Sequence, residues 1–231
     1  MNYDITEINK FSALASKWWD PNGPCAPLHV LNKCRLQFIQ MHTELNNKNV
    51  LDIGCGGGIL AESLAGLKAK VSGVDASEAV IAEAKAHAAI KGLDIDYHAA
   101  TIESLFESHK LHFDVITCME LLEHVPDPAK LIHDCVQLLK PGGKLFLSTL
   151  NRTLKAYALA IVGAEYIFNI LPKQTHDYKK FITPAELENM LHITDMKLNV
   201  LKGVKYNPLT KSATIITDLS VNYLALATKE I

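Results

Sequence analysis

The most constraining feature of this sequence is the stretch NVLDIGCGGGILAE at residues 49–62. It starts with an apolar run of the kind that fills the centre of a parallel sheet. A glycine run from Gly54 to Gly58 follows, and a helical pattern of apolar residues begins directly after it. A strand, a glycine turn and a helix in succession bring bare backbone and a helix N-terminus toward a ligand. The stretch therefore predicts the ligand-binding edge of an α/β sheet.

The spacing of the glycines indicates which ligand this edge binds. A dinucleotide-binding turn has the spacing G-x-G-x-x-G, but Ile59 stands where the third glycine would be. The glycines fit G-x-G-x-G instead, at Gly54, Gly56 and Gly58, and the strand before them carries Asp52. This pattern resembles motif I of the class I methyltransferases that use S-adenosylmethionine (SAM). In that motif the loop passes under the methionine part of the cofactor.

An acidic residue after the next strand supports the same interpretation. Residues 70–75 are predicted to form this strand, and it ends in Asp75, roughly twenty residues beyond the glycine turn, where an acid binds both hydroxyls of a ribose. A glycine turn alone would be weak evidence, because tight turns use glycine for conformational reasons. Here the glycine turn stands within a longer pattern, in which a strand, the turn, a helix, a second strand and an acid follow one another at the expected spacing. This pattern predicts a nucleoside-type cofactor.

Length and composition limit the class of protein. The 231 residues suffice for a single α/β domain, 1–231, with a substantial core and some additions. A net charge of −2 gives no electrostatic reason to expect nucleic acid as a partner. The five cysteines contain no C-x-x-C pair, which indicates a reducing compartment. Neither a signal segment nor a membrane span is evident, so we expect a cytoplasmic protein.

The segments after residue 48 alternate between strand and helix patterns. The predicted strands are 49–53, 70–74, 95–98, 113–118, 144–149, 197–204 and 221–227. The predicted helices are 58–66, 77–91, 101–108, 128–139 and one that starts at Thr183, and a turn is expected at 140–143. Such alternation predicts a Rossmann-like, doubly wound sheet that is mostly parallel. We expect a C-terminal strand to be antiparallel.

The N-terminal residues 1–45 are predicted to form a helical cap, with helices at 4–17 and 28–43. Trp18 and Trp19 lie between these helices, and adjacent residues cannot share one helix face. They form either a hydrophobic latch for the first helix or part of a substrate pocket. Arg35 is either solvated, as most arginines are, or a charge-assisted donor to the carboxylate of a cofactor.

Segments outside the generic fold make the resemblance more specific. They are SKWWDPNGPCAPLHVLN (16–32), CMELLEHVPDP (118–128), STLNRT (148–153), VGAEYI (162–167), LPKQTHDYKKFITPAEL (171–187), GVKYNP (203–208) and VNYL (221–224). On these segments the chain resembles the ubiquinone-biosynthesis O-methyltransferases over nearly its whole length. The resemblance implies SAM-dependent methylation of polyprenylated phenols, namely 2-polyprenyl-6-hydroxyphenol and 3-demethylubiquinol. It also implies SAM contacts from Arg35, Gly54, Asp75 and Met119.

Three polar residues just after strand 113–118 are the candidates for chemistry. A phenol with a pKa of about 10 is mostly protonated at neutral pH, so its methylation needs a base or a cation nearby. Glu120 and His124 are the candidate catalytic residues, although His124 could instead only fix the loop before helix 128–139. Glu120, Glu123 and His124 are also candidate ligands for a Mg²⁺ ion that a catechol would complete.

Residues 153–182 are predicted to form a helical lid insertion. The segment combines apolar and basic side chains, and a polyprenylated substrate is confined to the bilayer. The lid would dock on the anionic inner face of the cytoplasmic membrane, or it would be a fixed cover of the site. Other ubiquinone-biosynthesis proteins are candidate partners. The alternative functions are methylation of another lipophilic catechol and a non-catalytic SAM-binding scaffold in a biosynthetic complex.

Overall fold

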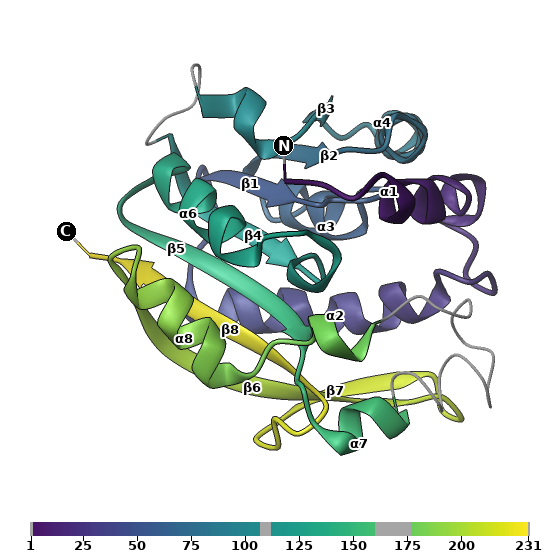
Figure 1. Cartoon of the computed structure of the whole chain (residues 1–231). Coiled ribbons are helices and arrows are strands. Elements are labelled where there is room, and N and C mark those ends of the chain that lie inside the picture. The colour runs from purple at the N-terminus through teal and green to yellow at the C-terminus, as the bar shows by residue number, and fades with distance from the viewer. Residues whose placement is uncertain (1, 107–111, 160–176, 231) are drawn as a thin grey trace.

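The computed structural model describes residues 2–106, 112–159 and 177–230. Its framework is an eight-stranded sheet with the order β3-β2-β1-β4-β5-β8-β6-β7, and helices lie on both of its faces (Figure 1). The strands are β1 (Asn49–Ile53), β2 (Lys70–Asp75), β3 (Ile95–Ala99), β4 (Phe113–Met119), β5 (Leu139–Leu150), β6 (Met196–Asn207), β7 (Ser212–Ile216) and β8 (Asn222–Lys229). The first five pair in parallel, which confirms the predicted Rossmann-like arrangement.

The helices fall into those that precede the sheet and those that connect its strands. The α-helices are α1 (Ile5–Ser12), α2 (Ala26–His42), α3 (Ile59–Ala65), α4 (Glu78–Lys91), α6 (Pro128–Leu138), α7 (Leu154–Ala156) and α8 (Pro184–His192). Short 3₁₀ helices are η1 (Ala15–Lys17), η2 (Ile102–Leu105), η3 (Leu122–His124) and η5 (Tyr178–Lys180). The predicted helix at 4–17 thus ends at Ser12. Neither glycine nor proline marks this break, so apolar spacing alone made the predicted helix too long.

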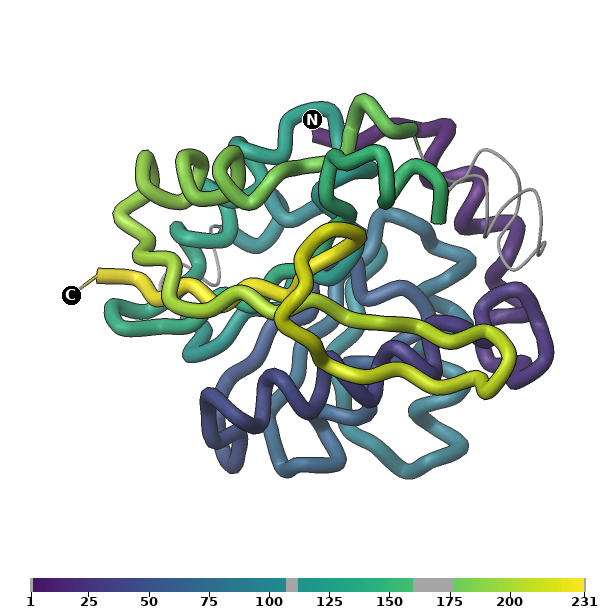
Figure 2. Tube along the Cα trace, turned by 90° about the horizontal axis from the view of Figure 1, so that it is seen from below, coloured from purple at the N-terminus to yellow at the C-terminus, as the bar shows by residue number. Residues whose placement is uncertain are grey.

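Two hydrophobic cores cover the two faces of the sheet, because successive side chains of a strand point to opposite faces. Leu51 and Ile53 of β1 join the core that contains α6 and α8, whereas Val50 joins the core that contains α2, α3 and α4. Helix α2 also packs against β7, and Figure 2 shows the β6–β7 hairpin lying across it. The central strands are therefore buried on both sides, as their apolar runs predicted.

The C-terminal part of the sheet departs from the parallel pattern. Strand β8 lies between β5 and β6 and is antiparallel to both, which confirms the expected antiparallel strand. Strand β7 was not predicted; it pairs with β6 as an edge hairpin. Strand β5 begins at Leu139, which already pairs with Phe113 of β4. The expected turn at 140–143 therefore lies within β5, where the register against β4 shifts and the strand bulges.

Local signals set several helix ends as expected. Ser77 is the N-cap of α4 and accepts a hydrogen bond from the backbone N–H of Val80. Asp127 caps α6 in the same way. Thr183 and Glu186 form a reciprocal capping box at the start of α8. These ends were predictable because each depends on residues three positions apart.

Three further expectations concern the lid, membrane spans and cysteines. Most of the predicted lid at 153–182 lies outside the described residues, which include only 153–159 and 177–182 of it. No helix in the described parts of the chain combines the length and the apolar character that crossing a membrane requires. All five cysteines are buried free thiols.

Candidate functional site

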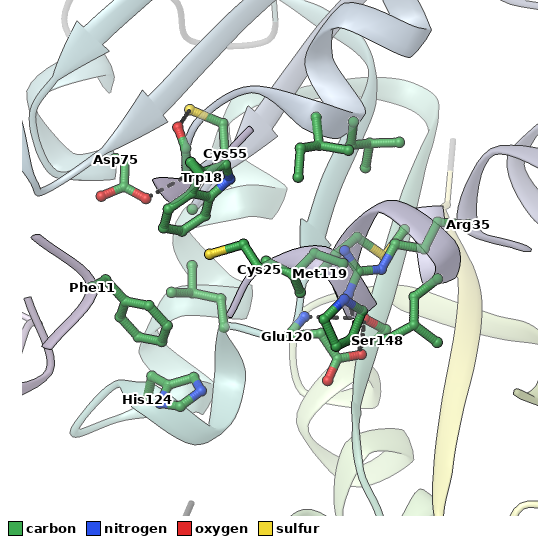
Figure 3. Close-up of a pocket in the computed structure, with 18 of the residues that line it drawn as sticks. Phe11, Trp18, Cys25, Arg35, Cys55, Asp75, Met119, Glu120, His124 and Ser148 are labelled. Atoms are coloured by element: carbon green, nitrogen blue, oxygen red, sulfur yellow. Dashed lines mark hydrogen bonds and ion pairs between the residues drawn. The ribbon is translucent and has the colours of Figure 1, made fainter. Parts of the chain in front are cut away.

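A cavity of about 490 Å³ opens at the carboxyl ends of β1, β2 and β4. Ligands of open α/β sheets bind at this edge, because the loops that follow the strands converge there. The glycine loop after β1, the loop after β4 and the N-terminal segment all contribute to its wall (Figure 3). The lining is mostly apolar, and its polar groups gather at a few points.

The first polar point is the carboxylate of Asp75 at the end of β2. Its Oδ2 accepts a hydrogen bond of 3.1 Å from the backbone N–H of Gly56, and its Oδ1 accepts one of 2.9 Å from that of Ser77. Burial raises the pKa of Asp75 above its ordinary value. The acid and the glycine loop are thus joined directly, and both line the cavity.

The three predicted glycines are needed for different structural reasons. Gly54 has a φ of +65°, and a Cβ on it would come within 2.9 Å of the Leu121 side chain. Gly58 has a φ of +88°, and its Cβ would meet the hydroxyl of Tyr97 at 2.2 Å. Gly54 and Gly56 line the cavity, but Gly58 does not. Gly58 therefore serves the close packing of α3 on the sheet.

The second polar point groups Arg35, Glu120 and Ser148 on one side of the cavity (Figure 3). Arg35 is buried, so the alternative of a solvated arginine is wrong. Its Nη2 lies 3.7 Å from Oε1 of Glu120 and makes no hydrogen bond. Ser148 Oγ donates to that same oxygen at 2.8 Å, and the backbone of Glu120 has a left-handed φ of +54°. Strained backbone of this kind concentrates at functional sites.

Asp52 and Met119 are buried in the cavity wall. Oδ1 of Asp52 accepts a hydrogen bond of 2.6 Å from the Thr117 hydroxyl. Burial raises the pKa of Asp52 to about 7, although this hydrogen bond and the nearby Arg35 act in the opposite direction. Both predicted residues therefore reach the site, Met119 as an apolar surface and Asp52 as a carboxyl that is difficult to ionise.

The three candidate metal ligands after β4 point to different partners. Glu120 contacts Ser148, whereas Glu123 is buried and accepts a 2.8 Å hydrogen bond from Thr149. Nδ1 of His124 lies 2.8 Å from Oε2 of Glu7. Within the described parts of the chain, no three His, Cys, Asp or Glu side chains are close enough to hold a metal ion. The residues therefore do not fit the expected Mg²⁺ site.

Electrostatics separate these carboxyl groups further. Burial, reinforced by repulsion from Glu120, raises the pKa of Glu123 to about 8. The hydrogen bond from His124 lowers the pKa of Glu7 to about 2. Glu123 lies outside the cavity lining, whereas His124 and Glu7 line it together. The catalytic candidate His124 is therefore paired with Glu7, and Glu120 is paired elsewhere.

The two tryptophans occupy different places, one in the cavity wall and one against the glycine loop and His87. Trp18 lines the cavity, and its indole covers the bare backbone of Gly56 and Gly57. Nε1 of Trp19 donates a 2.9 Å hydrogen bond to the carbonyl of Gly57, and its ring stacks on His87 with centroids 3.5 Å apart. Trp18 is thus a pocket residue, and Trp19 is the latch.

Several lining residues were not singled out from the sequence. Glu7 and Phe11 of α1, Ser148 of β5 and Asn222 of β8 line the main cavity. A smaller cavity of about 110 Å³ beside it includes Ile102 after β3. The apolar spacing of α1 indicated only that the helix packs on the domain. The residues from β5, β8 and the segment after β3 lie at the site because of the strand order, which no local sequence pattern reveals.

Comparisons with known proteins show the family of this chain. Residues 29–198 match the family model described as a methyltransferase domain. The chain is 50% identical to the ubiquinone biosynthesis O-methyltransferase of Thiobacillus denitrificans, with 99% of each chain covered. It is 51% identical to that of Nitrosococcus oceani, covering 100% of this chain and 98% of the relative.

Solved structures support the fold. The magnesium protoporphyrin IX methyltransferase of Synechocystis PCC 6803 with bound SAH superposes with a TM-score of 0.70 at 18% identity, covering 98% of this chain and 100% of that one. A SAM-dependent methyltransferase from Methanosarcina mazei superposes with a TM-score of 0.63 at 22% identity, over 83% of this chain and 97% of that one. With relatives about 50% identical over full length, the chain belongs to the ubiquinone biosynthesis O-methyltransferase family.

Proposed function

We propose that this protein transfers a methyl group from SAM to phenolic hydroxyls of polyprenylated ubiquinone precursors, 2-polyprenyl-6-hydroxyphenol and 3-demethylubiquinol. One observation carries the proposal: a single cavity is lined by His124 and by all of the predicted cofactor residues except Gly58. The names of the full-length relatives support the reaction and the pathway. The whole chain, 1–231, then acts as one methyltransferase domain, with residues 1–45 as its helical cap.

The residues around the glycine loop fit SAM. The carboxylate of Asp75 is positioned by two backbone N–H groups and would accept the hydroxyls of the ribose. The buried Nη2 of Arg35 makes no hydrogen bond and would donate to the carboxylate of the methionine part. Met119 would pack against the adenine, and the bare backbone at Gly54 and Gly56 would let the cofactor approach. Bound SAM supplies an electrophilic methyl group.

The chain itself would position the acceptor oxygen and remove its proton. Holding the reacting atoms in line can lower the barrier by roughly 7–11 kcal/mol. We assign the role of base to His124, which lines the cavity. With SAM bound as the methyl donor, His124 would accept the proton that the phenol oxygen loses when it is methylated. Glu120, held by its contacts with Arg35 and Ser148, would orient the acceptor.

The substrate suggests where the protein works. A polyprenylated phenol stays in the bilayer, so the enzyme must meet it at a surface. Leu154, Tyr157 and Leu159 are exposed in the described part of residues 153–182, and Lys179 and Lys180 follow in the same segment. We propose that this segment docks on the anionic inner face of the cytoplasmic membrane. Other ubiquinone-biosynthesis proteins would then be neighbours of the enzyme on that surface.

Product analysis tests the proposed reaction. The purified protein is incubated with SAM and a short-chain demethylubiquinol, and mass spectrometry follows the product. We expect one added methyl group on the phenolic oxygen, with kcat reduced about 100-fold or more in His124→Gln, the usual contribution of a general base. If only other catechols are methylated, the substrate assignment is wrong. If SAM binds but nothing is methylated, the protein is a SAM-binding scaffold.

A further inference from the structure

The contact between Glu7 and His124 joins parts of the chain that are 117 residues apart. The carboxylate oxygen and the imidazole Nδ1 lie 2.8 Å from each other, and the two side chains are only 13% and 7% exposed. Glu7 comes from the N-terminal helix α1, and His124 comes from the loop after β4. Both side chains line the main cavity and the smaller cavity beside it.

No residue of helix α1 is fully buried, so side-chain tethers add to the packing of Phe11 in holding the helix. Before its first turn, the side chain of Asn2 donates to the carbonyl of Asp127 and accepts from the N–H of the same residue. At its end, Ser12 Oγ lies 2.7 Å from Ser77 Oγ. Glu7 lies between these two tethers, over the cavity edge. Figure 3 shows Phe11, from the same helix, beside His124.

The chemistry of this contact determines where His124 carries its proton. An ionised carboxylate only accepts hydrogen bonds, so the imidazole nitrogen next to it must carry hydrogen. With Nδ1 protonated, a neutral imidazole has its lone pair on Nε2, which is then the nitrogen able to take a proton. Phe11 packs edge to face on the imidazole, with centroids 5.2 Å apart and planes at 90°, and restrains the ring as well.

We propose that Glu7 is a positioning residue for methyl transfer, holding His124 with Nδ1 protonated, so that Nε2 is the basic nitrogen of the ring. The inference rests on the proposed role of His124 as base. It adds the N-terminal helix to the catalytic apparatus, because the helix supplies the group that orients the base. A purely structural tether at Glu7 would instead act like the tether at Asn2.

Steady-state kinetics with SAM and a short-chain demethylubiquinol separate these roles. For Glu7→Ala we expect kcat to fall about 10- to 100-fold, the range found for carboxylates that orient metal-binding histidines, with KM for SAM changed less than twofold. Glu7→Gln keeps the size and one acceptor oxygen, so it should recover part of the lost kcat. Asn2→Ala loosens the same helix without touching His124, and its kcat should stay near that of the wild type.

A double variant completes the test. In Glu7→Ala/His124→Gln the loss of kcat should equal that of His124→Gln alone, because Glu7 acts through the imidazole. Multiplicative losses in the double variant, or equal kinetics for Glu7→Ala and Asn2→Ala, would overturn the role of Glu7 and leave His124 as the base. A His124→Gln variant with wild-type kcat would instead refute the base assignment and, with it, this inference.

Discussion

Asp75 illustrates how single residues of the site depend on the backbone around them. Its carboxylate is held by N–H groups of the glycine loop and of the turn before α4, so one side chain aligns two loops. The sequence indicated this residue because the spacing of a glycine turn and an acid is a local pattern. The orientation of the carboxylate depends on both loops, and only the structure provides it.

Replacing Asp75 should weaken SAM binding. Asp75→Ala removes the proposed acceptor of the ribose hydroxyls, and we expect a loss of about 1.5–3 kcal/mol, the range for hydrogen bonds to a charged group. Isothermal titration calorimetry measures the affinity, and circular dichroism verifies folding. Asp94→Ala, at an exposed acid after α4, is the matched control and should bind SAM normally. Unchanged affinity in a folded Asp75→Ala variant would contradict the assignment.

Glu123 should make stability depend on pH. Its pKa in the folded protein is raised to about 8, mainly by burial, from 4.5. Folding therefore disfavours the ionised form, and the stability that this group costs grows as the pH rises from 4.5 to 8. Glu123→Gln removes that cost. The free energy of unfolding of the variant, relative to that of the wild type, should therefore rise by about 1–3 kcal/mol from pH 5 to pH 8. Urea unfolding at pH 5 and at pH 8 measures the free energy of unfolding of both proteins. If variant and wild type differ by the same amount at both pH values, the prediction is wrong.

Among the structural elements, those defined by local patterns were predicted and those defined by distant partners were not. β1, α4 and α8 follow from apolar spacing and capping residues. β7 has exposed and half-buried residues only, so no strong alternation marks it, and its pairing with β6 makes it a strand. The role of α1 was missed for the same reason, because its partner His124 lies far away in the sequence.

The element-scale prediction concerns residues 153–182. Wild-type protein should float with anionic liposomes and should do so less at high salt, because screening weakens the attraction of its lysines to the lipid. Lys179→Glu/Lys180→Glu should reduce flotation while a water-soluble substrate analogue is still methylated. Lys85→Glu/Lys91→Glu places the same charge change on exposed positions of α4 and should float normally.

The alternative for this segment is a fixed cover of the active site. If the wild type does not bind anionic liposomes, or if both double variants float equally well, the segment does not dock on membranes. Capture of the substrate would then need another surface of the protein.

At the scale of the whole molecule, the main cavity joins segments from both halves of the chain. One cavity is lined by residues from α1, α2, the end of β2, the loops after β1 and β4, and strands β5 and β8. The sequence predicted the sheet that brings these segments together, and six of the seven residues that it predicted as cofactor contacts line the cavity. It did not identify Glu7, Ser148 or Asn222, because their position depends on the complete topology.

Since so many segments meet there, SAM should stabilise the whole fold. At a SAM concentration of 100 Kd, binding to the native state adds about 2.7 kcal/mol. For a protein of this size that corresponds to a rise in Tm of about 5–10 °C. Differential scanning fluorimetry measures the shift, which should be smaller in Asp75→Ala at the same SAM concentration. The absence of any shift in the wild type would contradict SAM binding at this cavity.

The placement of the tryptophans has an optical consequence. The chain contains two tryptophans, and both indoles contact the same glycine loop, one over the cavity and the other stacked on His87. Tryptophan emission from this protein therefore arises only beside the glycine loop of the cavity. The enzyme carries a built-in fluorescent reporter, and occupancy of the loop can be followed in stopped-flow experiments without an attached dye.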